Sequence, residues 1–391
     1  MNEVRVVLIA TYEMGRQPFG LASPAAFLRA AGHHVRMVDS SVEPVPASAI
    51  AAADLVAFHL PMHTATRLAA PMIAQVTALN PRAKVACYGL YAPINAEYLR
   101  GLGADFIIGG EFEAELVRLA ADPGRHSPPL VSLERLAFPL PDRAALPGLV
   151  NYAKLDPDSG GPLRLVGYTE ASRGCKHLCR HCPVVPVYEG KFRIVPPEVV
   201  LADIRQQVAA GGAQHITFGD PDFFNGPAHA MRIVEAFGAE FPRVTYDVTI
   251  KVEHLLRHRG LLTALARTGC VLVTTAVESL DDRVLALLDK GHTRADFVEA
   301  VALCRQAGLA LSPTFIPFTP WTTRASYRDL LETLAQLNLA PAVAPIQLAV
   351  SLRRQRHRAT ARRLHEPVVP NRDRSRDSPE SDLGEPHPVR Q

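Results

Sequence analysis

The chain has 391 residues, 48% of them hydrophobic, which is enough to bury two cores of ordinary domain size. It has no apolar run of the ~18 to 20 residues that a membrane helix needs, and its first residues begin a strand pattern instead of a basic signal region. We therefore expect a cytoplasmic protein whose six cysteines stay reduced, with no membrane partner. The net charge is +3, but residues 351–391 contribute +4, so the body of the chain shows no basic nucleic-acid surface.

Residues 1–121 alternate apolar strands with helical patterns, which predicts an α/β domain with a doubly wound parallel sheet. We expect strands at residues 4–10, 34–38, 55–59, 84–88 and 106–108, and helices at residues 23–31, 71–79, 95–102 and 113–121. Ser23 is the expected cap of the first helix, with Pro24 at its first position. Such sheets bind ligands at the carboxyl ends of their strands.

Residues 122–163 are rich in proline and glycine, and we expect them to form an ordered linker between two domains. From residue 164 to residue 350 the strand and helix patterns alternate again, about six times. This alternation predicts a partial, TIM-like (β/α)6 barrel with strands near residues 165, 216, 246, 272, 311 and 348. Functional residues of complete barrels lie at the carboxyl ends of the strands, and we expect the same here.

Cys175, Cys179 and Cys182 follow the first barrel strand at CxxxCxxC spacing. Three thiolates can hold three irons of a [4Fe-4S] cluster and leave the fourth iron open to a ligand. The alternative is a structural zinc site closed by His177 or His181, because zinc accepts Cys3His ligation. The other cysteines lie in apolar patterns and are expected to be small buried hydrophobes: Cys87, Cys270 and Cys304.

This cysteine loop resembles the cluster loop of radical S-adenosylmethionine (SAM) enzymes. The resemblance implies that the open iron chelates the amino and carboxylate groups of SAM. It also implies that an electron from the reduced cluster cleaves the sulfonium bond and gives a 5′-deoxyadenosyl radical. An electron donor of the flavodoxin or ferredoxin type follows from the same chemistry, whereas the substrate does not.

The second barrel strand ends in the sequence Phe218-Gly219-Asp220-Pro221-Asp222. This segment is similar to the one with which the family receives the methionine amino group of SAM. The resemblance makes Gly219 and Asp220 expected SAM contacts and leaves Asp222 unassigned. The alternative is that both aspartates cap the following turn, a common role of this residue.

Glu278 ends the fourth barrel strand, where a carboxylate can accept both ribose hydroxyls, as acidic residues do in dinucleotide folds. The position resembles the ribose-binding strand of the family. Lys251 ends the third strand and is a candidate partner of the SAM carboxylate, with a solvated salt bridge as the alternative. The resemblance also places the backbone of His181 and the strand end at Ile316 against adenine.

The first domain is similar to the cobalamin-binding domain that precedes the barrel in many members of this family. Its strand-end loops contain the expected cobalamin contacts: Gly15, Gln17, Leu60, Gly89, Gly109 and Gly110. The Asp-x-His-x-x-Gly signature that supplies a lower cobalt ligand is missing, so cobalamin would be held without a protein imidazole on cobalt. The alternative is a flavodoxin-like domain that only packs on the barrel.

Residues 1–350 most closely resemble the radical SAM branch named for a terminal Cys-Cys-Ala-Glu-Pro tail or its selenocysteine counterpart. The tail itself is missing, and residues 351–391 are rich in arginine without an apolar period. Such a composition favours disorder or a lost reading frame. A basic arm for nucleic acid is the other alternative, but no aromatic residue is interleaved to stack on bases.

These patterns together predict a radical SAM enzyme that abstracts hydrogen from an unactivated carbon. With cobalamin bound, methyl transfer is the expected outcome, because the cofactor carries that step. A cobalamin-free radical rearrangement or peptide modification is the alternative within enzymes. An iron–sulfur protein of electron transfer or regulation that does not cleave SAM is the alternative outside them.

Overall fold

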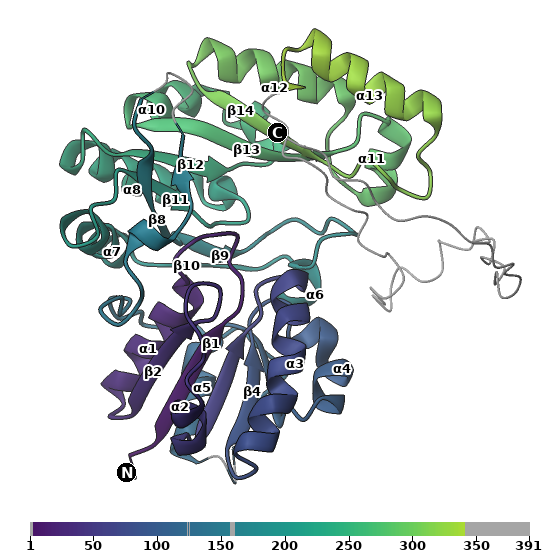
Figure 1. Ribbon diagram of the computed structural model, residues 1–391. Coiled ribbons are helices and arrows are strands. Elements are labelled where there is room, and N and C mark those ends of the chain that lie inside the picture. The colour runs from purple at the N-terminus through teal and green to yellow at the C-terminus, as the bar shows by residue number, and fades with distance from the viewer. Residues whose placement is uncertain (1–2, 123, 125, 157–160, 341–391) are drawn as a thin grey trace, which may run out of the picture. The chain divides into compact units, whose positions relative to one another are not determined.

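The computed structural model describes residues 3–122, 124, 126–156 and 161–340 (Figure 1). Its strands form two six-stranded sheets and one short hairpin. The barrel strand expected near residue 348 and the tail at residues 351–391 lie outside the described residues. Among the helices within these ranges, none is both long enough and apolar enough to cross a membrane.

The first sheet confirms the predicted doubly wound architecture, with strand order β2-β1-β3-β4-β5-β6 and parallel pairing throughout. Its strands are β1 (Arg5–Ala10), β2 (His34–Asp39), β3 (Leu55–His59), β4 (Lys84–Tyr88), β5 (Phe106–Gly110) and β6 (Val131–Ser132). The order reverses between β1 and β3, and the carboxyl ends at such a point leave room for a ligand.

Helices cover both faces of this sheet: α1 (Phe19–Ala30), α2 (Ala47–Ala52), α3 (His63–Leu79), α4 (Ala96–Gly101) and α5 (Glu113–Ala121), with a 3-10 turn η1 (Pro93–Asn95). Alternate residues of β1 point to opposite faces, because the side-chain period of a strand is two. Val6 and Leu8 pack against α1 and α5, whereas Val7 and Ile9 pack against α2, α3 and α4. The sheet is therefore buried on both sides, as a parallel sheet requires.

Helix α1 begins earlier than predicted, because its cap is Pro18 and not Ser23. Ser23 and Pro24 lie inside the helix, where Pro24 cannot donate to the carbonyl of Gly20. The hydroxyl of Tyr88 donates to that carbonyl instead, at 2.8 Å, so the buried acceptor keeps a partner. The predicted cap was wrong because Tyr88, which lets Pro24 lie inside the helix, comes from β4 and is distant in the sequence.

The second sheet has the order β14-β13-β12-β11-β8-β7, in which consecutive strands are neighbours, as in a barrel. Its strands are β7 (Lys154–Leu155), β8 (Arg164–Thr169), β11 (His215–Phe218), β12 (Thr245–Thr249), β13 (Cys270–Glu278) and β14 (Ala310–Phe315). All pairs are parallel except β7 with β8. The five barrel strands expected within the described residues are thus confirmed, and they form a partial barrel.

The barrel helices are α7 (Pro197–Ala209), α8 (Pro227–Glu240), α9 (Val252–Arg257), α10 (Leu262–Arg267), α11 (Asp282–Leu288), α12 (Arg294–Gln306) and α13 (Arg324–Gln336). Shorter elements are the hairpin β9 (Ser172–Gly174) and β10 (Phe192–Ile194), helix α6 (Val185–Tyr188), and the turns η2 (Leu149–Asn151), η3 (Phe223–Asn225) and η4 (Arg259–Leu261). The three cysteines outside the motif are buried, as predicted: Cys87, Cys270 and Cys304.

The segment predicted as a linker contributes to both sheets, since β6 pairs with β5 and β7 pairs with β8. Arg143 in this segment is buried and binds both carboxylate oxygens of Asp203 on α7, at 2.7 and 2.8 Å. Its Nη1 donates to Gln17 after β1, at 2.7 Å, and its Nη2 also donates to the Tyr168 carbonyl on β8, at 2.6 Å. One guanidinium therefore ties three segments together.

Arg173 on β9 makes a second buried junction, directly before the cysteine loop. Its guanidinium lies 2.7 Å from Glu113 and 2.7 Å from Glu170, and 3.4 Å from Glu111. It also lies over the ring of Phe138, 4.9 Å from the ring centre. Three buried or half-buried carboxylates share one cation, and burial raises the pKa of Glu111 to about 7, opposed by the charge of Arg173.

We predict that Arg143→Met lowers the free energy of unfolding by about 3–5 kcal/mol, because the Asp203 carboxylate stays buried without its cation. Urea denaturation of the purified chain measures this loss. The matched control is Arg205→Met, which removes an exposed, solvent-screened partner of Glu240 and should lower stability far less than Arg143→Met. Equal losses in the two variants would contradict the role of Arg143.

We predict that Glu111→Gln changes the pH dependence of stability. The folded pKa of Glu111, about 7, lies above its ordinary value of 4.5, so wild-type stability falls as the pH rises between these values and the carboxyl must ionise. The variant lacks this loss, and its melting temperature relative to wild type should be higher at pH ~8 than at pH ~5. A difference that is the same at both pH values would show that Glu111 does not titrate in this range.

Candidate functional site

The cysteine loop follows β9 and lies at the carboxyl ends of the barrel strands. Cys175, Cys179 and Cys182 are free thiols, and the Cys182 N–H donates to the Cys179 carbonyl at 3.1 Å. Gly174 starts the loop with φ of +76°, and a Cβ on it would lie 2.4 Å from the ring of Tyr188. The loop is thus held close to α6, where Cys175 and Cys182 pack beside Val184, Val187 and Tyr188.

The environment of these thiols fits a metal cluster. Burial raises the pKa of Cys175 to about 12 and that of Cys182 to about 11. A bound metal ion supplies the positive charge that such buried thiols need in order to lose their protons. Both histidines that could complete a zinc site have other neighbours, because His177 lies 3.1 Å from His254 and His181 lies 3.0 Å from Glu278.

Glu278, at the end of β13, has an uncommon backbone and an open carboxylate oxygen. Its φ is +71°, and the register of β13 against β14 shifts at this point. Strained non-glycine residues of this kind gather at functional sites. Oε1 lies 3.0 Å from His181 and 3.6 Å from Lys290, whereas Oε2 is buried without a hydrogen-bond partner among the described residues.

The charges around Glu278 keep it ionised. Burial alone would raise its pKa, but the hydrogen bond with His181 and the Lys290 ammonium hold the pKa below its ordinary value. The backbone N–H of Ile316 donates to the Glu278 carbonyl at 2.9 Å. Glu278 and Ile316 line one hollow together with residues 279–281, Pro317 and α13. The structure therefore brings His181, Glu278 and Ile316 together, as the sequence predicted.

Gly219 and Asp220 lie at the end of β11, on the side of the cysteine loop. A Cβ on Gly219 would lie 1.8 Å from the Tyr168 hydroxyl, so this position admits only glycine. Asp220 accepts hydrogen bonds from the Ala171 N–H at 2.9 Å and the Ser172 hydroxyl at 2.6 Å. Burial raises its pKa to about 7. Both oxygens of Asp220 thus hold the segment that leads into β9.

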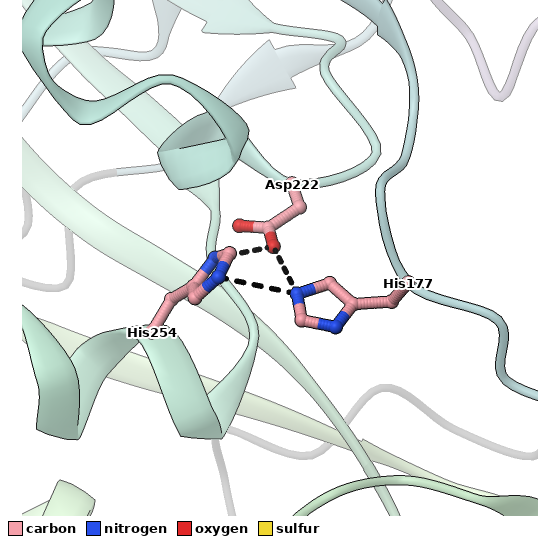
Figure 2. A group of neighbouring side chains, drawn as sticks. All are labelled: His177, Asp222 and His254. Carbon is pink, nitrogen blue, oxygen red and sulfur yellow. Dashed lines mark hydrogen bonds and ion pairs between the residues drawn. The ribbon is translucent and has the colours of Figure 1, made fainter. Parts of the chain in front are cut away.

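Lys251 is buried at the end of β12 and belongs to a cluster that includes a cysteine-loop residue. Its Nζ lies 3.1 Å from Nδ1 of His177 and 3.2 Å from Glu253. On its other side His177 adjoins Asp222 and His254 (Figure 2). Burial, followed by the charges of Lys251 and His254, lowers the pKa of His177 to about 4. Lys251 thus makes the salt bridge considered for it, but the pair with Glu253 is largely buried and not solvated.

The expected cobalamin contacts lie at the carboxyl edge of the first sheet. Gly15 has φ of +74°, and Leu60 is fully buried after β3. Gln17 is also buried, and its amide donates to the Pro147 carbonyl at 2.9 Å and accepts from Arg143. Gly89 has φ of +104°, which favours glycine after β4.

Gly109 and Gly110 are explained by protein contacts. A Cβ on Gly109 would lie 2.2 Å from the ring of Pro93, and one on Gly110 would lie 2.1 Å from the Ser132 carbonyl. The absence of side chains on these two glycines therefore lets η1 and β6 pack closely against the end of β5. The sequence did not reveal this approach, because β6 has only two residues and follows an irregular segment.

Sequence reasoning did not predict several polar contacts at the same edges. Glu13 lies 2.6 Å from the imidazole of His59, where β1 and β3 end. Tyr188 donates to Glu111 at 2.9 Å and so joins the cysteine loop to β5. His254 on α9 lies 3.1 Å from His177 of the cysteine loop. Each contact joins segments that are far apart in the chain, so no local sequence pattern predicts it.

Comparison with known families divides the chain in the same place as its two sheets. Residues 169–334 match the Radical SAM superfamily, and residues 5–120 match the B12 binding domain. These two matches account for the cysteine loop and for the carboxyl edge of the first sheet. They identify a [4Fe-4S] cluster, SAM and cobalamin as the cofactors.

Three curated relatives show the range of similarity. The tRNA-2-methylthio-N(6)-dimethylallyladenosine synthase of Moorella thermoacetica is 26% identical over 42% of this chain and 38% of its own length. The anaerobic magnesium-protoporphyrin IX monomethyl ester cyclase of Synechocystis is 23% identical over 82% of this chain and 68% of its own. The hopanoid C-3 methylase of Methylococcus capsulatus is 25% identical over 78% and 62%. The chain thus spans from 38% to 68% of the length of these relatives.

Solved structures share the arrangement of both domains. The radical SAM methyltransferase TsrM from Kitasatospora setae, with cobalamin and a [4Fe-4S] cluster bound, has a TM-score of 0.66 at 17% identity and covers 86% of this chain and 70% of its own. The cobalamin-dependent radical enzyme OxsB has a TM-score of 0.65 at 16% identity, covering 85% and 52%. At such identities the likeness establishes the fold. The chain thus contains a B12-binding domain followed by a radical SAM domain, as the two family matches identify them.

Proposed function

We propose that this enzyme is a cobalamin-dependent methyltransferase that acts on an unactivated carbon. The observation that carries the proposal is one chain with both a cysteine loop for a cluster and a B12-binding sheet. Among similar proteins, TsrM is named a methyltransferase and the Methylococcus protein a methylase. When bound, the cluster supplies the electron for SAM cleavage, and cobalamin carries the methyl group.

The residues at the barrel edge suit the two ends of SAM. In this proposal Cys175, Cys179 and Cys182 hold the cluster. The open oxygen of Glu278 accepts from the ribose hydroxyls, and Lys290 keeps that carboxylate charged. His181 lies in the cysteine loop, and its hydrogen bond at 3.0 Å positions the Glu278 carboxylate.

The methionine end of SAM is assigned to the neighbouring strand ends. We propose that the Lys251 ammonium faces the SAM carboxylate. The SAM carboxylate and Glu253 would then share this ammonium. Gly219 and Asp220 are proposed at the methionine amino group. Because both oxygens of Asp220 already accept hydrogen bonds, its part is to hold Ala171 and Ser172 in place beside that group.

The carboxyl edge of the first sheet is the proposed seat of cobalamin, with Gly15, Gln17, Leu60 and Gly89 as its contacts. The missing lower-ligand signature supports binding without a protein imidazole on cobalt. His59 supports the same view, because its ring is buried beside Glu13 and Tyr88 and a Cβ on Gly20 would lie 2.0 Å from it.

The enzyme needs a reductant, and we propose a flavodoxin or ferredoxin as the donor. The resemblance of residues 1–350 to the branch with a Cys-Cys-Ala-Glu-Pro tail is part of the same proposal. A cobalamin-free rearrangement would fit the barrel equally well, but the B12-binding sheet would then have no role in the reaction. Substrate class is decided by loops that the motifs do not specify.

We predict that Glu278→Gln keeps the cluster but weakens SAM binding at least ~10-fold, since a neutral amide cannot accept two hydroxyls as a carboxylate does. Cys179→Ser should abolish the cluster and the formation of 5′-deoxyadenosine. Iron content, cluster absorbance and anaerobic SAM cleavage measure the three effects separately.

The matched control is Asp247→Asn, a buried carboxylate within β12 that pairs with His215 at 2.7 Å, away from the strand ends. This variant should keep both the cluster and SAM cleavage. Wild-type SAM binding in Glu278→Gln, with Asp247→Asn also unchanged, would contradict the assignment of Glu278.

We predict that cobalamin binds the cluster-loaded enzyme at about one equivalent per chain and makes it form S-adenosylhomocysteine, the product left when SAM gives up its methyl group. Gel filtration followed by absorbance measures binding, and chromatography measures the product with and without cobalamin. Formation of 5′-deoxyadenosine alone, unaffected by cobalamin, would favour the cobalamin-free rearrangement.

A further inference from the structure

Three side chains converge beside the cysteine loop in a cluster that the proposed function does not use: His177, Asp222 and His254 (Figure 2). His177 belongs to the cysteine loop, Asp222 follows β11, and His254 lies on α9. We call these three residues the His-Asp-His cluster. Asp222 and His254 are almost completely buried, and the His177 side chain is 14% exposed.

The donor atoms of the cluster lie at distances that suit a shared ion. Nε2 of His177 lies 3.1 Å from Nε2 of His254 and 3.7 Å from Oδ2 of Asp222. Nδ1 of His254 lies 2.7 Å from the same Oδ2. An imidazole gives one nitrogen to an ion, and with one donor atom from each residue the three donor atoms lie within 4.8 Å of one another.

Hydrogen bonding accounts for only part of this arrangement, the contact of His177 with His254 at 3.1 Å. Oδ2 of Asp222 and Nδ1 of His254 are both buried and have no hydrogen-bond partner among the described residues, although they lie side by side. A buried polar atom without a partner costs free energy, so such atoms in a native structure require an explanation. An ion between them would satisfy both atoms at once.

The surroundings orient each donor toward the centre of the cluster. Oδ1 of Asp222 accepts from the backbone N–H of Phe224 at 3.2 Å, which leaves Oδ2 for the ion. Nδ1 of His177 lies 3.1 Å from Nζ of Lys251 and 3.7 Å from the Glu253 carboxylate, and Nε2 faces the other two residues. Outer contacts of this kind fix the orientation of metal-binding histidines and carboxylates. Lys251 is itself paired with Glu253, so the charge of Asp222 is available to a cation.

We propose that the His-Asp-His cluster binds a divalent transition-metal ion, separate from the iron–sulfur cluster. Two imidazoles and one carboxylate suit Zn²⁺ or Fe²⁺, whereas Mg²⁺ and Ca²⁺ prefer oxygen ligands alone. The ion would join the cysteine loop to the ends of β11 and β12, and water would complete its coordination. The site contains no cysteine and therefore differs from the Cys3His zinc site considered above.

The test measures metal bound by the cluster-loaded enzyme. The protein is equilibrated anaerobically with Zn²⁺, desalted, and analysed for zinc and iron by mass spectrometry, with cluster absorbance recorded on the same sample. We expect wild type to keep about one zinc per chain, and the double variant Asp222→Asn/His254→Gln to lose at least ~10-fold of it. A parallel titration with Fe²⁺ distinguishes the two ions.

The double variant retains all three cysteines, so zinc held by thiols would be the same in both proteins. The matched control is His258→Gln, which alters an imidazole beside His254 that lies outside the cluster and should leave zinc binding unchanged. If the double variant does not fold, as judged by circular dichroism, His254→Gln alone provides the comparison.

Two results would overturn the proposal: wild type that retains no zinc or iron beyond the cluster, or a variant that retains the wild-type amount. Loss of zinc with an intact cluster absorbance supports it. Failure of SAM cleavage with normal zinc binding would count against the proposed function alone, because metal content and 5′-deoxyadenosine are measured independently.

Discussion

The site depends most on the buried guanidinium of Arg173. Its cation compensates three carboxylates that come from both the first sheet and the barrel, and it lies two residues before Cys175. Without it, Glu111, Glu113 and Glu170 would repel one another in a region from which water is excluded. The start of the cysteine loop is therefore set by an electrostatic constraint that involves both domains.

Tyr188 and Gly174, which flank the cysteine loop, also constrain its position. Gly174 has a backbone that favours glycine, and its missing side chain lets the chain approach the ring of Tyr188. Tyr188 in turn donates to Glu111, the carboxyl with the raised pKa. Packing and charge thus act on the same few residues, and the thiols are enclosed as a consequence.

Across the barrel edge, the polar atoms without partners mark where ligands belong. Glu278 keeps one oxygen open at a strained backbone position, and Asp222 and His254 each keep one open atom in the His-Asp-His cluster. By contrast, both oxygens of the buried Asp203 carboxylate are engaged by Arg143. Unsatisfied groups persist where a bound molecule or ion offsets their cost.

Local sequence determined the architecture of this protein, because alternating strand and helix patterns and the CxxxCxxC spacing are local features. They predicted both sheets and the cysteine loop at the carboxyl ends of the barrel strands, since the carboxyl ends of neighbouring strands meet at one edge. The true start of α1, the role of Gly109 and Gly110, and the convergence of His177, Asp222 and His254 were decided only by tertiary structure. Each depends on a partner distant in the chain, and a local pattern carries no information about which distant group will fill a space or meet a charge.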